Sequence, residues 1–207
     1  MAKLVLSKSG LQKQRENMRL YERVLPSLEL KRMQLTSELK RARQALADVQ
    51  AETERRLQRV SEQLPMLADG EIDLAGLVHV ESIDVREENV VGVKLPSLVA
   101  VRCGVAGYAM LARPHWVDTV AEELKRMVTH KALVQVTAER VRLLEVAARK
   151  VTQRTNLFEK ILIPQAQGNI RKIRIYLADA DRASVVRSKI TKRIRQKQAQ
   201  ALLGATP

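Results

Sequence analysis

Apolar residues recur every three or four positions along two long stretches of the chain, and a middle stretch with another pattern separates them. In the first stretch the repeat starts at Leu4 and keeps its phase to Thr53, after which one longer step reaches Leu57. A sustained repeat near 3.5 residues is typical of coiled-coil helices, and one extra residue locally unwinds the coil. The pattern therefore predicts a helical arm over residues 1–67, bent where Pro26 removes a backbone donor.

The same repeat returns in the last part of the chain. It can be followed from Thr137 onward, and it passes Pro164 in four-residue steps before the three-four spacing resumes. Because the apolar positions continue on both sides, Pro164 and Gly168 mark a kink in a helix rather than its end. We expect a second coiled-coil helix over residues 116–201 and a disordered tail over residues 202–207.

The middle stretch, residues 68–115, favours strands. Five of the eight glycines lie there, and two segments rich in β-branched residues, 83–85 and 90–95, flank four polar residues. This pattern predicts a β-hairpin closed by a polar turn and stopped at Pro96, and residues 98–101 are a candidate further strand. Because two strands alone are marginal in water, we expect the hairpin to lean on the coil or on a partner.

These elements together predict a mainly α fold, in which the N- and C-terminal arms pair as a long antiparallel two-helix coiled coil and the middle segment holds a short β-hairpin. The chain then doubles back on itself, so that one molecule supplies both helices of the coil. The expected inward-facing seam consists of Leu28, Leu35, Leu39, Leu46, Val49, Val141, Leu144, Val151, Phe158, Leu162, Ile173 and Leu177.

Composition agrees with long helices and narrows the functional classes. Of the 207 residues 29% are charged and only 2% are aromatic, and aromatic residues are the large fillers of globular cores. A single cysteine, Cys103, rules out an internal disulfide and suits a reducing compartment. With no secretory signal and no apolar run long enough for a membrane span, we expect a cytoplasmic protein without direct membrane insertion.

No group of residues in the sequence predicts an active site. His79, His115 and His130 do not cluster with Cys103 at the spacing of a metal site, and packed or surface histidines are the simpler interpretation. The glycines of residues 104–107 lack the Gly-Lys-Ser/Thr that a phosphate-binding loop needs, so a turn is the simpler interpretation there. We therefore expect no catalytic residue, no metal and no cofactor.

The formal net charge of +14 predicts association with something acidic, which can be nucleic acid, an anionic membrane face or a protein surface. Six basic residues fall between Arg187 and Lys197, with Ile190 and Ile194 as a narrow apolar edge. This basic segment is either a solvated helix face or an electrostatic contact surface. It contains no aromatic residue that could stack on bases, although contact with duplex phosphates needs none.

One segment of the second arm resembles a known family. The run Arg-Thr-Asn-Leu-Phe-Glu-Lys-Ile-Leu-Ile-Pro from Arg154 to Pro164 is similar to the signature of the D subunit of the rotary V-type (vacuolar/archaeal-type) ATPases, with Asn156 and Glu159 at motif positions. Phe158 stands where the family usually has Leu. The resemblance continues in segments 170–174 and 187–192, and in the first arm and middle stretch it covers segments 28–35 and 89–96.

The resemblance implies a non-catalytic subunit of a rotary ATPase, present once per complex. In that family the paired terminal helices form a central shaft inside a ring of alternating A and B subunits, the F subunit binds the lower shaft, and the C (eukaryotic d) subunit joins the shaft to the membrane rotor. The shaft couples ATP hydrolysis or synthesis in the ring to transport of protons or sodium ions. The expected contacts with the catalytic ring are Arg171, Lys172, Arg174, Arg187, Lys189, Lys192 and Arg193.

Two other functional classes fit the charge and the coil. A basic coiled-coil nucleic-acid-binding protein would bind DNA in a salt-dependent manner and would have no affinity for a subunit ring. A coiled-coil tether would form a homodimer, whereas a shaft subunit that pairs its own arms would be a monomer.

Overall fold

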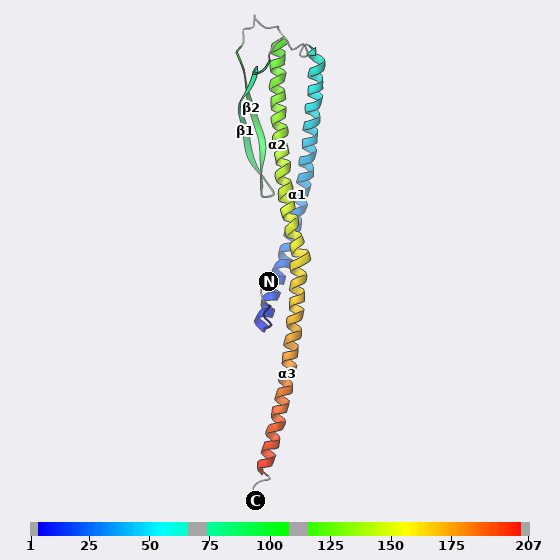
Figure 1. The fold of residues 1–207 in the computed structure, drawn as a ribbon, viewed down its shortest axis with the longest axis vertical. Coiled ribbons are helices and arrows are strands. Elements are labelled where there is room, and N and C mark those ends of the chain that lie inside the picture. Colours follow the sequence, from blue (N-terminus) through cyan, green and yellow to red (C-terminus); the bar gives the residue numbers. More distant parts are fainter. Residues whose placement is uncertain (1–3, 66–73, 108–115, 204–207) are drawn as a thin grey trace. The chain divides into compact units, whose positions relative to one another are not determined.

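The computed structural model describes residues 4–65, 74–107 and 116–203, and in it helices flank a two-stranded antiparallel hairpin (Figure 1). The predicted mainly α fold with a hairpin in the middle is confirmed. The elements in chain order are α1 (Lys8–Gln63), β1 (Val78–Val90), β2 (Val93–Val105), α2 (Trp116–Leu157), the π-helical turn η3 (Phe158–Leu162) and α3 (Ile163–Leu203). The disordered tail was predicted to start at residue 202, but α3 runs to Leu203. Residues 204–207 lie outside the described residues.

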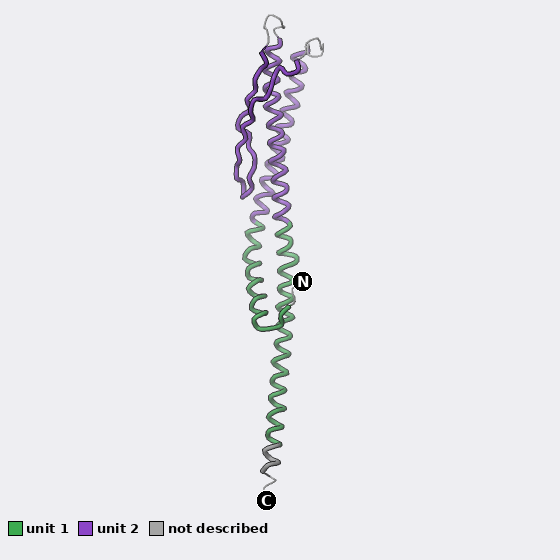
Figure 2. The backbone as a smooth tube through the Cα atoms, turned by 60° about the vertical axis from the view of Figure 1, so that its left-hand side comes forward, with its two compact units in different colours: residues 1–29, 153–207 green, residues 30–152 purple. Residues whose placement is uncertain are grey.

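The chain divides into two compact units, which are described separately (Figure 2). Unit 1 consists of residues 1–29 and 153–207, and unit 2 consists of residues 30–152. Each unit therefore contains a segment of α1 together with a segment of the later helices.

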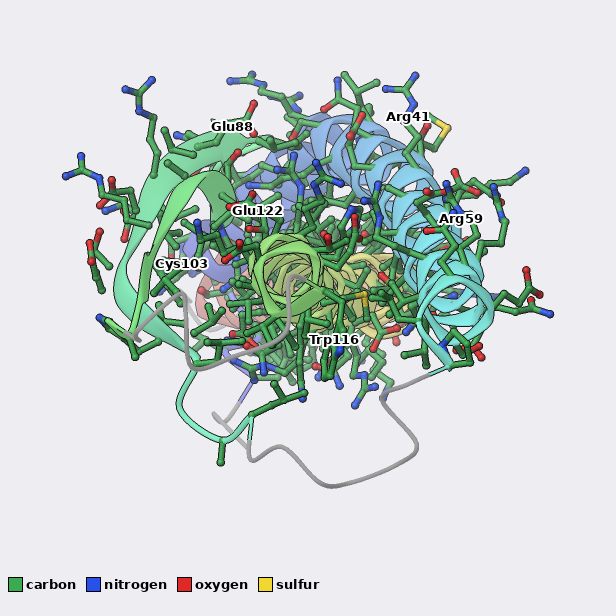
Figure 3. All side chains as sticks on the ribbon, turned by 90° about the horizontal axis from the view of Figure 1, so that it is seen from above. Arg41, Arg59, Glu88, Cys103, Trp116 and Glu122 are labelled. Atoms are coloured by element: carbon green, nitrogen blue, oxygen red, sulfur yellow. The ribbon has the colours of Figure 1, made fainter. Side chains whose placement is uncertain are left out.

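In unit 2, α2 lies between α1 on one side and the hairpin on the other (Figures 1 and 3). Leu35 of α1, Leu144 of α2 and Leu95 of β2 are 0–1% exposed, so all three elements contribute to one core. Two apolar clusters hold the unit together. The first consists of Leu35, Ala42, Leu95, Val141, Leu144 and Val151, and the second of Leu64, Leu77, Val117, Val120 and Ala121.

The hairpin is held at both ends. At the turn, Val90, Val91 and Val93 pack against the first cluster around the buried Leu95. At the open end, Leu77 belongs to the second cluster, together with flanking valines of both strands. Because a two-stranded ribbon has little stability of its own, this support from the helices keeps it folded.

The structure corrects the predicted limits of the hairpin. Residues 86–89, expected to form the turn, lie inside β1, and the turn is the pair Val91–Gly92 with φ of 52° and 77°. Positive φ at both central residues is the pattern of a type I′ turn, whose twist matches that of the flanking strands. Pro96 does not stop the strand, and residues 98–101 belong to β2.

Two physical reasons explain these differences. In a two-stranded ribbon every second backbone N–H faces an open edge, and a proline at such a position costs no ladder bond. The polar residues 86–89 of β1 are exposed, and Glu87 forms an ion pair with Lys94 across the hairpin at 3.0 Å. A polar run in an exposed strand therefore resembles a turn in the sequence.

In unit 1 the start of α1 lies alongside the end of α2, η3 and the first part of α3 (Figure 2). The Tyr21 ring meets the edge of the Phe158 ring with centroids 5.4 Å apart, which gives a reason for Phe158 at a position where Leu is usual. Ala166, Ile170 and Ile173 are 0–7% exposed on the same side of the helix.

A capped turn begins α1. The Gly10 N–H donates to Ser7 Oγ at 3.0 Å, and the Leu11 N–H donates to the Ser7 carbonyl at 2.9 Å. The preceding residues fold back so closely that a side chain at Gly10 would collide with the Val5 carbonyl oxygen. Ser7 is therefore the N-cap, and the lack of a side chain at Gly10 allows the backbone at Val5 to pack against the first turn of α1.

A π-helical turn joins α2 to α3. The Ile163 N–H bonds to the carbonyl of Phe158, five residues back, and Pro164 follows at once. A proline has no N–H for the carbonyl four residues before it, and its ring collides with that carbonyl in a regular α-helix. The wider turn accommodates this defect, and helical residues continue from one side to the other.

The predicted seam residues are all buried or half-buried, and Leu177 is the last of them. One step of the repeat is wrong, because Leu57 is 50% exposed. The half-buried residue at that level of α1 is Arg56, whose side chain is 25% exposed. A long aliphatic stem can lie along an apolar surface while its charged end reaches water, and this allows an arginine at the seam.

Candidate interaction surfaces

The C-terminal half of α3 forms a continuous basic surface. Between Arg182 and Lys197 there are seven Lys or Arg residues and no Asp or Glu. Every residue in this range is exposed except the half-buried Ala183, because among the described residues of unit 1 no other helix packs there (Figure 2). Ile190 and Ile194 are each 51% exposed and lie four residues apart on the same face.

The seven residues predicted to contact a partner ring all belong to α3 and are all exposed. Within the described part of the chain, no ion pair shorter than 4 Å forms at any of them. They fall into two groups, and the structure separates these along the helix. Arg171, Lys172 and Arg174 lie where α3 still pairs with α1, and Arg187, Lys189, Lys192 and Arg193 lie beyond that pairing.

The four motif positions surround the π-helical turn. Arg154, Glu159 and Pro164 are exposed, whereas Asn156 is half-buried. Nothing in their geometry resembles a catalytic arrangement. Glu159 lies within the turn, Arg154 and Asn156 belong to the last turn of α2 before it, and Pro164 follows it in α3, so the motif spans a distinctive backbone shape.

A groove between the two helices of unit 1 gathers arginines from both. It has a volume of about 850 Å³, and Arg15 and Arg19 of α1 face Arg171 and Arg174 of α3 across it. Glu22 is the one acidic residue that lines it. The sequence interpretation missed Arg15 and Arg19, although their four-residue spacing beside a seam position was a signal that they share one side of the helix.

A second hollow, of about 310 Å³, lies where α1, α2 and β2 of unit 2 meet. Its lining combines apolar residues, among them Pro96 and Leu98 from the hairpin, with polar and charged ones. Nearby, Arg140 of α2 donates to Glu88 of β1 at 3.0 Å, and Arg43 of α1 donates to Glu145 of α2 at 2.6 Å. Because both ion pairs are exposed, they connect α1, α2 and β1 but contribute little to the stability of the fold.

Most ion pairs among the described residues run along single exposed helix faces. Hydrogen bonding from Lys125 lowers the pKa of Glu122, and hydrogen bonding from Arg142 lowers the pKa of Glu139. Arg59 lies on the side of α1 that faces away from α2 (Figure 3). This distribution is that of solvated helices, with their ion pairs three or four residues apart.

His79 and Cys103 both belong to the hairpin, where His79 is opposite Gly104, the neighbour of Cys103, whereas His130 lies in α2. His79 is exposed, 3.9 Å from Glu81, and Cys103 is half-buried and free. His130 is half-buried, and its Nδ1 has no hydrogen-bond partner, whereas His115 lies outside the described residues. Across residues 4–65, 74–107 and 116–203, no cluster of three or more His, Cys, Asp or Glu could hold a metal ion.

None of the helices in the described ranges combines the length and apolarity needed to cross a membrane.

Comparison with known proteins gives one consistent result. The model of the ATP synthase D subunit family matches residues 10–193. The chain is 31% identical over 192 residues to a V-type ATP synthase D subunit of Borreliella burgdorferi, and the aligned residues cover 93% of this chain and 95% of the relative. It is 30% identical over 206 residues to a protein of the same name from Chlamydia felis, covering 97% and 98% of the two chains.

Proposed function

The chain belongs to the ATP synthase D subunit family, and on this premise we propose that it is the D subunit of a V-type ATP synthase and the rotating central shaft of its complex. In this role it transmits torque between ATP hydrolysis or synthesis in the catalytic ring and transport of protons or sodium ions in the membrane sector. The chain itself is not catalytic. One copy turns in the cytoplasm, peripheral to the membrane, as part of the membrane-bound complex.

The observation that carries this proposal is the pairing of helices within each unit. A shaft must resist twisting, and two helices locked by buried side chains such as Leu35 and Leu144 are stiffer than one. In unit 1 the Tyr21–Phe158 ring contact and the buried Ile173 serve the same purpose. The seam is formed within one chain, as a monomeric shaft requires.

The basic surface of α3 supports a particular kind of contact with the ring of A and B subunits. Exposed charges attract an oppositely charged wall over about 8 Å at physiological ionic strength, and they need no fixed partner. Deep apolar interlocking would hold the shaft in one orientation, whereas such contacts can be exchanged as it turns. We assign this role to the seven exposed α3 residues from Arg171 to Arg193 described above.

The remaining partners follow from the family. The F subunit binds the lower shaft, and the C (d) subunit connects the shaft to the membrane rotor. The hairpin, held against α1 and α2 at both ends, belongs to the end of the shaft away from the ring.

The test is reassembly of the complete complex, with the A and B subunits of the ring and the membrane sector that transports ions. A variant in which Arg187, Lys189, Lys192 and Arg193 become Gln is compared with a control in which four exposed basic residues of unit 2 become Gln. The control residues are Lys40, Lys131, Arg149 and Lys150, which give the same change in charge.

We expect the α3 variant to assemble weakly or to pump fewer ions per ATP hydrolysed, and the control to behave as the native chain. Both should retain the native helical circular dichroism, since exposed Gln is a good helix former. Unchanged coupling in the α3 variant would refute the assigned contacts. A native chain that forms a homodimer, or that binds duplex DNA and neither ring protein, would instead favour the tether or the nucleic-acid-binding alternative.

A further inference from the structure

The groove of unit 1 between α1 and α3 has the composition of an anion-binding site. Arg15, Arg19, Arg171 and Arg174 contribute four positive charges and Glu22 one negative charge, which leaves three positive charges in a space of about 850 Å³. All four arginines are exposed, and in the part of the chain that the structure describes none of them forms an ion pair. Guanidinium groups in this state are available to a ligand.

We propose that this groove binds an acidic helix or loop of a partner subunit, through carboxylates that bridge arginines of both helices. The proposal rests on the proposed function in taking the partner from the same complex. It adds a site that α3 alone cannot form, because half of the arginines come from α1.

The arrangement of the arginines favours carboxylates spaced along a peptide over a single phosphate. Arg15 and Arg19 are four residues apart and therefore rise about 6 Å along α1, and Arg171 and Arg174 rise about 4.5 Å along α3. The charges thus form two short rows. A phosphate site usually adds free backbone N–H groups at a helix start, whereas these residues lie inside helices whose N–H groups are already bonded.

The floor of the groove supports the same choice. Met18 of α1 is half-buried and Ile170 of α3 is 7% exposed, and both line the groove together with Ile175, which is 55% exposed. A peptide can place an apolar side chain on this floor while its carboxylates accept paired hydrogen bonds from guanidinium groups. A free inorganic anion gains nothing from an apolar floor.

The first experiment measures binding of a helical peptide, with two Glu residues four apart and a Leu between them, to the full-length chain by fluorescence anisotropy. The groove variant is Arg15→Glu/Arg19→Glu. The matched control is Lys13→Glu/Arg23→Glu, which makes the same charge change at exposed residues of the same part of α1 outside the groove lining. Thermal unfolding of all three proteins checks that they remain folded.

We expect the groove variant to bind at least about tenfold more weakly than the native chain, since charge-assisted hydrogen bonds are lost and replaced by repulsion. The control should stay within about twofold, and the affinity of the native chain should fall as salt is raised. An equal loss in both variants would mean that net charge alone attracts the peptide and would overturn the proposal. Competition would also overturn the proposal if inorganic phosphate or duplex DNA displaced the peptide at a concentration similar to that of the peptide itself, and if this displacement depended on Arg15 and Arg19 in the same way.

The second experiment separates this inference from the proposed function. The same three proteins are reassembled with the A and B subunits. Assembly of the native chain and the control but not of the groove variant supports the site. Assembly of all three overturns it. If the native chain joins no such complex, the proposed function fails, and a groove-dependent peptide affinity still establishes the acidic-peptide site.

Discussion

Leu95 is the residue on which the hairpin depends most, and its truncation tests the view that the helices hold the hairpin in place. Leu95 is 0% exposed and packs in the cluster shared by α1 and α2. Leu95→Ala removes three carbon atoms at about 0.8 kcal/mol each, and the cavity left behind brings the loss to about 3 kcal/mol. This amount corresponds to about two powers of ten in the equilibrium between closed and open hairpin.

We expect the loss to appear as local opening, because the two strands have little stability apart from the coil. Amide hydrogen exchange measures it directly. The amides of the hydrogen-bonded pair next to the turn, Val90 with Val93, should exchange about a hundredfold faster, while those in the middle of α1 and α2 change much less. The control is Val99→Ala, since Val99 lies in the same strand and is 60% exposed.

Two results would refute this reasoning. If exchange near the turn is unchanged in Leu95→Ala, the hairpin does not depend on the cluster. If Val99→Ala accelerates exchange as much as Leu95→Ala does, burial is not the source of the stability.

Three further predictions follow from single residues. Gly92→Ala should destabilise unit 2 by about 1 kcal/mol in urea unfolding, because φ is 77° there, whereas Gly107→Ala, with open space around its Cα and no positive φ, should have little effect. Gly168→Ala should stabilise α3 by about 0.5–1 kcal/mol against thermal unfolding, because Gly168 is inside a helix and a new Cβ meets nothing within 4 Å. Arg142→Gln should raise the pKa of Glu139 back toward its ordinary value of 4.5 in an NMR titration. Because the pKa of Glu139 is lowered in the native protein, the small stabilisation from its ion pair is present above pH 4.5 and is lost as the pH falls through the folded-state pKa.

The helices could be predicted because their signal is repeated many times. A seam of apolar residues over more than fifty positions survives individual exceptions, and so the fold class was predictable. The repeat was wrong at Leu57, where Arg56 is the half-buried residue, because a pattern of apolar residues cannot show that an arginine stem packs at the seam.

The turn of the hairpin was not predictable from residue preferences. Val at positive φ is rare, and Val91 adopts it because its side chain packs on the first apolar cluster, a contact between residues far apart in the sequence. The polar residues 86–89 gave the stronger local turn signal and were misleading for that reason. In such cases tertiary packing overrides local preference.

The arginine groove was predictable in part. Arg171 and Arg174 stood out within a basic helix, whereas Arg15 and Arg19 are two basic residues among many in a charged arm. Only the pairing of α1 with α3 places all four along one groove. The sequence shows which helix faces carry charge, and the register between the helices decides which faces meet.

The π-helical turn has a consequence for how the length of this chain can change during evolution. Elsewhere in a paired helix, losing one residue rotates everything beyond it by about 100° and turns the buried stripe toward solvent. Within Phe158–Leu162 the wide turn already contains one residue more than a regular turn, so a single deletion there would restore α-helical spacing and leave Ile170 and Ile173 on their buried side. Alignments of relatives should therefore tolerate a one-residue gap at this point of the helix and should rarely show one within the paired segments on either side.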